Sequence, residues 1–81
     1  MIRVEARLYA TLRKYHPEGK VGEALVRELA EGTSVQRFLE IELGVPPDEV
    51  KTVFVNGITR RFDHVLADGD RVGIFPPVGG G

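Results

Sequence analysis

The sequence predicts a single α+β domain, in which a mixed sheet of four to five strands packs around one main helix. Residues 2–8 alternate between apolar and polar side chains, as expected for a half-buried strand. Residues 35–43 place apolar side chains at helical spacing. The dipeptide Asn56-Gly57 follows an apolar run and is the strongest hairpin signal in the chain.

The first strand is expected to face the core with its even-numbered residues. Its apolar positions are Ile2, Val4, Ala6 and Leu8, which alternate with Arg3, Glu5, Arg7 and Tyr9. Residues 10–15 then predict a turn of helix with Leu12 and Tyr15 on one side. Residues 16–19, with His16 beside Pro17, predict a loop.

The second strand is predicted over residues 24–29, but its register stays open. Either Leu25 and Leu29 or Ala24 and Val26 can point toward the core. The pattern is too short to decide between these two sets.

The main helix is predicted to begin at Thr33. Thr33 is a good N-cap, and Gln36 three residues later would complete a capping box. The apolar residues that follow at helical spacing are Val35, Phe38, Leu39 and Leu43. Gly44 is typical of the position after a helix, and Pro46-Pro47 prevents the helix from resuming.

Three further strands follow the helix. Residues 52–55 predict a strand, the Asn56-Gly57 turn a hairpin, and residues 58–61 a short return strand. Asp68-Gly69-Asp70 predicts a turn and residues 71–75 the final strand.

This order of elements predicts a β-grasp, the ubiquitin-like architecture. An opening hairpin, a helical crossover and a closing strand would make the first and last strands parallel neighbours in the centre of the sheet. We expect residues 1–75 to form this domain and residues 76–81 to form a flexible C-terminal tail.

Composition excludes several classes of function. The net charge is −1 without a basic run, which argues against nucleic acid as the main partner. The absence of cysteine excludes a cysteine nucleophile, a cysteine-based zinc site and sulfur carriage on a thiol. No apolar run reaches the length of a membrane span, and the first residues leave no room for a signal peptide. We therefore expect a cytoplasmic protein that does not contact membranes.

No convincing active site is visible among the side chains. His16 and His64 are the two histidines, and neither accompanies a nucleophile pattern, so both are interpreted as turn residues. Asp63, Asp68 and Asp70 lack the spacing of a calcium loop. We expect no metal site and no permanently bound cofactor.

Aromatic residues gather on the face opposite the predicted core. Tyr9, Phe54 and Phe75 share this face with Arg3, Arg7 and Arg71. Such a patch beside the tail predicts a docking surface, because buried aromatic anchors dominate compact interfaces. We assign partner binding to Tyr9, Arg13, Phe54, Arg71 and Phe75.

The last six residues carry the most unusual chemistry in the chain. They are Pro76, Pro77, Val78, Gly79, Gly80 and Gly81. The prolines hold the root of the tail extended, and the glycines offer an unhindered backbone that ends in a carboxylate. This tail is typical of a segment threaded into an enzyme channel, and its six residues reach about 20 Å when extended. The reacting group would be the carboxylate of Gly81.

Residues 62–81 resemble the C-terminal signature of the small subunit of molybdopterin synthase. The likeness lies in Leu66, the Asp68-Gly69-Asp70 turn, the apolar strand and the ending Pro-Pro-Val-x-Gly-Gly. Residues 2–4, residues 8–13, the helix and the Val55-Asn56-Gly57 turn are similar to that family as well. Gly79 stands where the family more often has Ser, Ala or Thr, and a terminal Gly-Gly-Gly is similar to the thiamine-pathway sulfur carriers.

The resemblance implies a sulfur carrier rather than an enzyme. An adenylating enzyme of the ubiquitin-activating class would thread the tail and use ATP to convert the Gly81 carboxylate to an acyl-adenylate. A persulfide sulfur donor would then displace AMP and leave a thiocarboxylate. The tail would next enter a large synthase subunit, where the sulfur builds the dithiolene that ligates molybdenum or tungsten.

Three alternatives share this fold. One is a ubiquitin-like modifier whose Gly81 forms an isopeptide bond with lysine. Another is a sulfur carrier for thiamine or a different sulfur metabolite. The third is a β-grasp binding module whose terminal glycines are inert.

Overall fold

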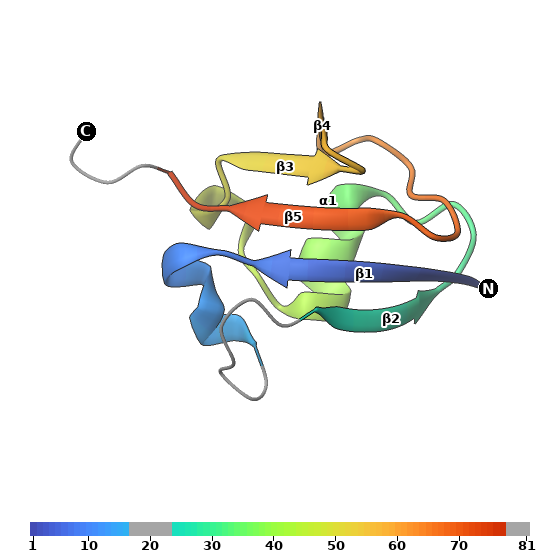
Figure 1. Cartoon of the computed structure of the whole chain (residues 1–81), viewed down its shortest axis with the longest axis horizontal. Coiled ribbons are helices and arrows are strands. Elements are labelled where there is room, and N and C mark those ends of the chain that lie inside the picture. Colours follow the sequence, from blue (N-terminus) through green and yellow to red (C-terminus); the bar gives the residue numbers. More distant parts are fainter. Residues whose placement is uncertain (17–23, 78–81) are drawn as a thin grey trace.

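The structure is a five-stranded mixed sheet with one main helix packed against it. This computed structural model describes residues 1–16 and 24–77. The strands are β1 (Ile2–Leu8), β2 (Leu25–Leu29), β3 (Thr52–Val55), β4 (Ile58–Arg60) and β5 (Arg71–Phe75). Their spatial order is β2-β1-β5-β3-β4, as Figure 1 shows. The predicted β-grasp is confirmed.

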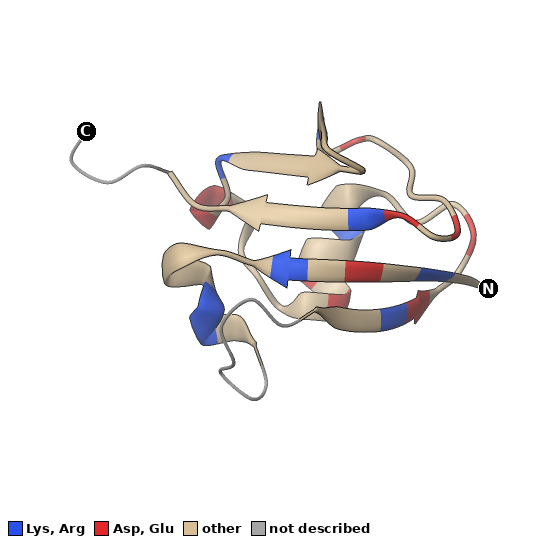
Figure 2. Ribbon diagram, in the orientation of Figure 1, with Lys and Arg blue, Asp and Glu red and all other residues tan. Residues whose placement is uncertain are grey.

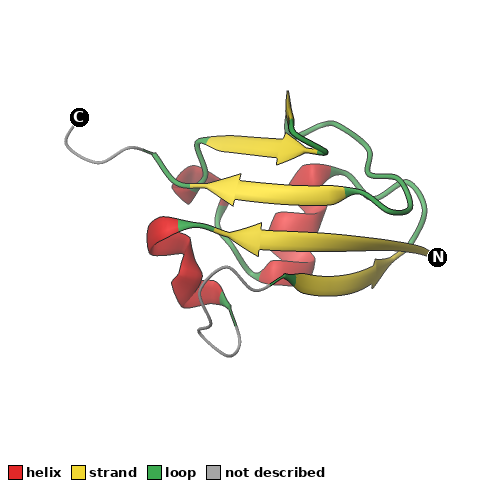
Figure 3. Ribbon diagram, in the orientation of Figure 1, coloured by secondary structure: helices red, strands yellow, loops and turns green. Residues whose placement is uncertain are grey.

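The two terminal strands lie side by side within the sheet. β1 and β5 pair in parallel, with Ala6 opposite Val72 and Leu8 opposite Ile74. All other neighbouring pairs are antiparallel. The main helix connects β2 to β3 and covers one face of the sheet (Figure 3). The opposite face carries no part of this main helix (Figure 3).

The main helix consists of α1 (Val35–Arg37) and η2 (Phe38–Leu43). η2 is wound as a π-helix, and the amide of Gly44 bonds to the carbonyl oxygen of Leu39, five residues earlier. Gly44 ends the helix with a left-handed backbone (φ 68°), as predicted.

The predicted N-cap was wrong by one residue. The hydroxyl of Ser34, not Thr33, accepts a hydrogen bond from the Arg37 amide at 3.2 Å. The Thr33 hydroxyl instead donates to the carbonyl oxygen of Ala30 at 2.7 Å. The capping box is also absent, because the side-chain amide of Gln36 donates to the carboxylate of Glu40 on the next turn.

The core lies between the sheet and the helix. Val35, Phe38, Leu39 and Ile74 are fully buried there. Other core residues are Ile2, Val4, Ala6, Leu8, Leu12, Leu25, Leu29, Val45, Val50, Val53, Val55, Leu66 and Val72, with Leu43 partly buried against them. β2 therefore directs Leu25 and Leu29 inward and leaves Val26 39% exposed, which settles its register.

Two short 3₁₀-helices, η1 (Ala10–Tyr15) and η3 (Pro47–Glu49), lie near the end of the sheet at which β5 finishes (Figure 1). Leu12 anchors η1 in the core, and His16 follows as a buried bend residue. The predicted loop at 16–19 otherwise falls outside the described residues.

Candidate docking face and tail root

Three aromatic rings form a cluster on the face of the sheet opposite the helix. Tyr9 follows β1 directly, Phe54 lies on β3, and Phe75 is the last residue of β5. The rings of Tyr9 and Phe75 are stacked, with centroids 4.3 Å apart and planes 3° apart. Phe54 meets Phe75 edge-on, at 5.4 Å and 84°. Stacked and edge-on arrangements are both favourable for aromatic pairs, so the three rings pack together as one cluster.

Gly73 lies beside this cluster in the middle of β5. It lies opposite Phe54 on β3 and opposite Arg7 on β1. A Cβ atom at Gly73 would be 3.5 Å from Phe75 Cε1 and 3.5 Å from Tyr9 Cε2. Both distances are ordinary van der Waals contacts, so the two rings lie directly beside the backbone of Gly73.

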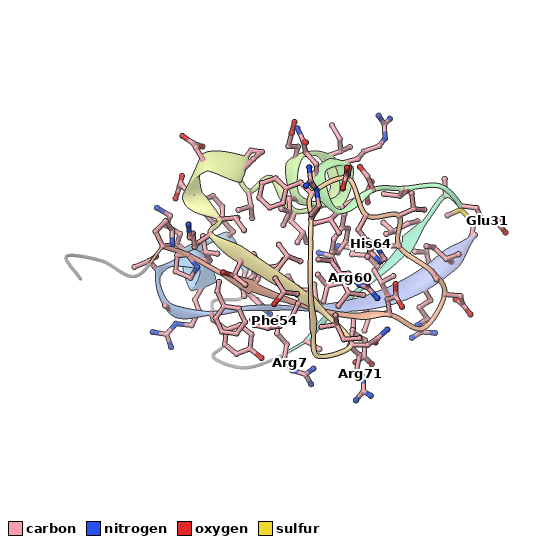
Figure 4. All side chains as sticks on the ribbon, turned by 90° about the horizontal axis from the view of Figure 1, so that it is seen from above. Arg7, Glu31, Phe54, Arg60, His64 and Arg71 are labelled. Atoms are coloured by element: carbon pink, nitrogen blue, oxygen red, sulfur yellow. The ribbon has the colours of Figure 1, made fainter. Side chains whose placement is uncertain are left out.

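A hollow of about 430 Å³ extends from the cluster toward the β3–β4 hairpin. Its lining residues are Arg7, Tyr9, Phe54, Asn56, Gly57, Arg71, Val72, Gly73 and Phe75. Arg7, Phe54 and Arg71 project from the sheet away from the helix (Figure 4). Two arginines and no carboxylate line the hollow, so it presents aromatic surface with positive charge beside it. Such a surface complements an apolar partner bearing acidic groups.

A polar contact fixes the far end of the hollow. Asn56 has a left-handed backbone (φ 53°), as the predicted hairpin requires. Its side-chain amide donates to Asp70 Oδ1 at 2.8 Å, and its Oδ1 accepts from the Arg71 amide at 3.0 Å. Asp70 is buried, and its Oδ2 accepts from the Ala67 amide at 2.8 Å. The hairpin is thereby joined to the start of β5.

The structure brings together four of the five residues assigned to partner binding. Tyr9, Phe54, Arg71 and Phe75 line the hollow. Arg13 does not. Its side chain is exposed on η1, and its Nε donates to the carbonyl oxygen of Ala10.

The other five lining residues were not assigned to partner binding from the sequence; they are Arg7, Asn56, Gly57, Val72 and Gly73. Arg7 had been placed on this face by its alternation along β1, and that alternation was reason enough to include it.

The root of the tail continues directly from this face. The Lys51 amide donates a hydrogen bond to the carbonyl oxygen of Phe75 at 2.9 Å. Among the described residues, this is the last backbone hydrogen bond that β5 makes. Pro76 is half-buried and Pro77 exposed. Val78, Gly79, Gly80 and Gly81 lie outside the described residues.

A second polar cluster joins η1 to η3 near the tail root. The Tyr15 hydroxyl donates to Glu49 Oε2 at 2.6 Å, and Lys14 Nζ lies 3.2 Å from Glu49 Oε1. The hydrogen bond from Tyr15, with that from Lys14, lowers the pKa of Glu49. The same contacts raise the pKa of Tyr15 and of Lys14. No sequence pattern pointed to this contact.

The other candidates have structural roles. His64 lies on the helix side of the sheet (Figure 4), where its carbonyl oxygen accepts from the Val35 amide at 2.8 Å. Asp68 accepts from the Arg3 amide at 2.8 Å. Across residues 1–16 and 24–77, no group of histidine and carboxylate side chains could hold a metal ion. No helix there is long and apolar enough to cross a membrane.

Comparison with known protein families agrees with this architecture. The sequence model of the family described as Mut7-C ubiquitin matches residues 1–79. The chain belongs to this family. No curated protein sequence matches it.

Several solved structures share the fold of this Mut7-C ubiquitin chain. A putative molybdopterin converting factor, subunit 1, from Pyrococcus furiosus is 27% identical, with a TM-score of 0.73, over 96% of this chain and 100% of that one. Small archaeal modifier protein 1 of Haloferax volcanii is 21% identical, with a TM-score of 0.74, over 96% and 100%. The Haloferax volcanii HVO 2177 protein is 28% identical, with a TM-score of 0.69, over 99% and 87%. The fold is that of small ubiquitin-like carrier and modifier proteins.

Proposed function

We propose that this protein is a sulfur carrier for the synthesis of molybdopterin, with the carboxylate of Gly81 as its reacting group. The protein supplies no active site of its own. In complex with a large synthase subunit, it would form a sulfurtransferase that builds the dithiolene of a molybdenum or tungsten cofactor.

The observation that carries this proposal is the route by which β5 leaves the sheet. Phe75 is held in the aromatic cluster, and the next two residues are prolines, which cannot donate a backbone hydrogen bond to a neighbouring strand. The chain thus leaves the sheet immediately beside the aromatic cluster, and the sequence ends in Gly79-Gly80-Gly81. The similarity to a putative molybdopterin converting factor subunit supports the same assignment.

The chemistry requires three steps at the terminal carboxyl group. A carboxylate oxygen of Gly81 attacks the α-phosphorus of ATP on an adenylating enzyme, and pyrophosphate leaves. The outer sulfur of a persulfide donor attacks the resulting acyl carbon, and AMP leaves. A second thiolate attacks the donor sulfur of the acyl disulfide, a disulfide of the donor and this thiol leaves, and the thiocarboxylate remains on Gly81. No side chain of this protein needs to take part in these steps.

The aromatic cluster and the hollow beside it would hold the carrier on its partner while the tail reaches the partner's active site. The adenylating enzyme and the large subunit would each cover the aromatic cluster, one after the other. Aromatic anchors provide contact area, while Arg7 and Arg71 orient partners that carry acidic groups.

The intact mass of the protein tests this function. The chain is co-expressed with its adenylating enzyme and purified without reducing agents. We expect a species whose mass has increased by the replacement of one oxygen atom by sulfur. The matched control lacks Gly80 and Gly81 and should stay unmodified. Absence of the sulfur-containing species, with the adenylating enzyme active on ATP, would contradict the proposal.

A second candidate is a protein modifier, in which a lysine amine attacks the same acyl-adenylate. The similarity to small archaeal modifier protein 1 favours it. Immunoblots of whole cells distinguish the two functions, because a modifier produces a ladder of larger conjugates that disappears when the two terminal glycines are removed. Sulfur transfer to thiamine or to another metabolite is distinguished from transfer to molybdopterin by measuring which of these products is lost in cells that lack the carrier.

A further inference from the structure

The backbone of β1 shows which of its residues face each neighbouring strand. The Glu5 amide donates to Asp70 and the Tyr9 amide to Ile74, both on the β5 side, and the Arg3 carbonyl oxygen accepts from Gly69 on that side. The amide and carbonyl of one strand residue point to the same side, and successive residues alternate. The even-numbered residues of β1 therefore direct their backbone groups toward β2.

The register of β2 then identifies its outward-facing backbone. Leu25, Arg27 and Leu29 lie opposite even-numbered residues of β1 and bond to them. Val26 and Glu28 consequently direct their amides and carbonyls away from β1. β2 is the outermost strand on this side of the sheet (Figure 1), so no described strand pairs with these groups. Unpaired groups of this kind form a template for another extended chain.

The side chains along this edge carry both apolar surface and charge. Arg27 Nη1 donates to the carbonyl oxygen of Val26 at 2.9 Å, which places its guanidinium group at the open edge. The side chain of Val26 is 39% exposed, on the face of the sheet opposite the core residues Leu25 and Leu29. β2 bears residues of both charge signs (Figure 2).

We propose that the open edge of β2 binds an extended peptide segment that carries a carboxylate opposite Arg27 and an apolar residue beside Val26. The peptide backbone would pair with the amides and carbonyls of Val26 and Glu28, as in other cases of strand addition. The guanidinium of Arg27 would give up its hydrogen bond to the Val26 carbonyl oxygen and bind the peptide carboxylate instead. The new hydrogen bond is charge-assisted on both sides and is therefore stronger. The released carbonyl would accept a peptide amide.

The charge of Arg27 favours this occupant over a second copy of the chain. Two antiparallel β2 strands that pair Val26 with Glu28 would place Arg27 directly opposite its own copy, and like charges directly opposite destabilise a sheet. The edge is also separate from the hollow, which residues of β1, β3, β5 and the β3–β4 turn line. A peptide on β2 and a partner on the aromatic cluster could therefore bind together, so this site does not depend on the proposed function.

Amide spectra of the full-length ¹⁵N-labelled chain test this site. The probe is a blocked pentapeptide of alternating valine and glutamate, added to millimolar concentration. We expect shifts centred on β2 and slower hydrogen exchange at the amides of Val26 and Glu28. The amides of Leu25 and Arg27 should show little change in exchange, because they already bond to β1.

Charge reversal provides the matched controls. Arg27→Glu should weaken binding of this peptide about tenfold and favour a peptide with lysine in place of glutamate. Arg60→Glu, on the opposite edge strand, should leave binding unchanged, and the spectra report whether each variant is folded. The proposal would be overturned if the unaltered protein bound the glutamate and lysine peptides equally well. It would also be overturned if the shifts were confined to the aromatic cluster, or if the amides of Val26 and Glu28 did not respond. Concentration-dependent pairing of β2 strands without peptide would overturn it as well, by identifying a second copy as the occupant.

Discussion

The ring of Tyr9 lies parallel to the ring of Phe75, with 4.3 Å between their centroids. This stack joins the residue that follows the first strand to the residue that precedes the tail. One contact therefore links the end of β1 to the end of β5 on the aromatic face.

Replacing Phe75 by alanine should weaken partner binding more than it weakens the fold. The side chain is half-buried on the sheet surface, so we expect the free energy of unfolding to fall by about 1–2 kcal/mol. Affinity for the large synthase subunit should fall at least tenfold, because central aromatic anchors dominate such interfaces. Denaturant unfolding and titration calorimetry measure the two effects. Loss of the fold together with binding would show that Phe75 is a core residue.

Replacing Phe38 by alanine should cost about 3–5 kcal/mol of stability, because its side chain is fully buried under the sheet. For a domain of this size, most of the protein would then be unfolded. The control is Ile41→Ala on the same helix, where the side chain is 64% exposed and the cost should be small. An unchanged melting temperature for Phe38→Ala would refute the assignment of the buried helix face.

Replacing Asp70 by alanine should lower stability by about 1–3 kcal/mol, because it leaves Asn56 and the Ala67 amide without their acceptor. The matched change Asp68→Ala removes one exposed bond, to the Arg3 amide, and should cost less. Thermal unfolding of both variants gives the comparison. A larger effect of Asp68→Ala would show that the Asn56–Asp70 contact does not hold the hairpin to β5.

The contact between Tyr15 and Glu49 should make stability depend on pH at both extremes. The pKa of Glu49 is lowered by folding, so its contribution is present above about pH 4.3 and is lost as the pH falls further. The pKa of Tyr15 is raised, so its contribution is present below about pH 10 and is lost as the pH rises. Tyr15→Phe should therefore lower the melting temperature most between these limits.

The control for this pH dependence is Tyr9→Phe, which removes the hydroxyl of the other tyrosine and leaves Glu49 untouched. A difference between Tyr15→Phe and the unmodified protein that stays constant from pH 3 to 11 would rule out the ionisation of Glu49 and Tyr15 as its source.

The secondary structure could be predicted from the sequence wherever the local pattern and the tertiary structure require the same residues. β1, β3 and β5 alternate clearly, and the Asn56-Gly57 turn has one favourable geometry, so these elements were predicted with correct or nearly correct bounds. β2 was ambiguous because the residues predicted for it, 24–29, fit either register, and the strand itself begins at Leu25. Its orientation is decided by which pair, Leu25 with Leu29 or Ala24 with Val26, the core can accommodate.

The errors arose where the choice depends on contacts between distant segments. Thr33 and Ser34 are both good caps, and the chain uses Ser34 because Thr33 is buried, with its carbonyl oxygen accepting from the Leu66 amide. The aromatic face was predicted from alternation, but the contact between Tyr15 and Glu49 joins two short 3₁₀-helices that no periodicity relates. The proposed role of the tail was reached from its residues and from the resemblance, and the structure adds only the position of its root beside the aromatic cluster.

Sulfur transfer by chains with an altered end tests the central claim most directly. Purified carrier, adenylating enzyme, ATP, a persulfide donor and the large subunit are combined, and the sulfur-containing product is measured. We expect the unaltered chain to be active. A chain without Gly81 and a chain with one residue added after it should be inactive, because either change displaces the reacting carboxylate by about 3.5 Å. Gly80→Val should fail as well, since a β-branched side chain widens the tail and restricts its backbone. Full activity of the shortened or extended chain would contradict the assignment of Gly81 as the reacting residue.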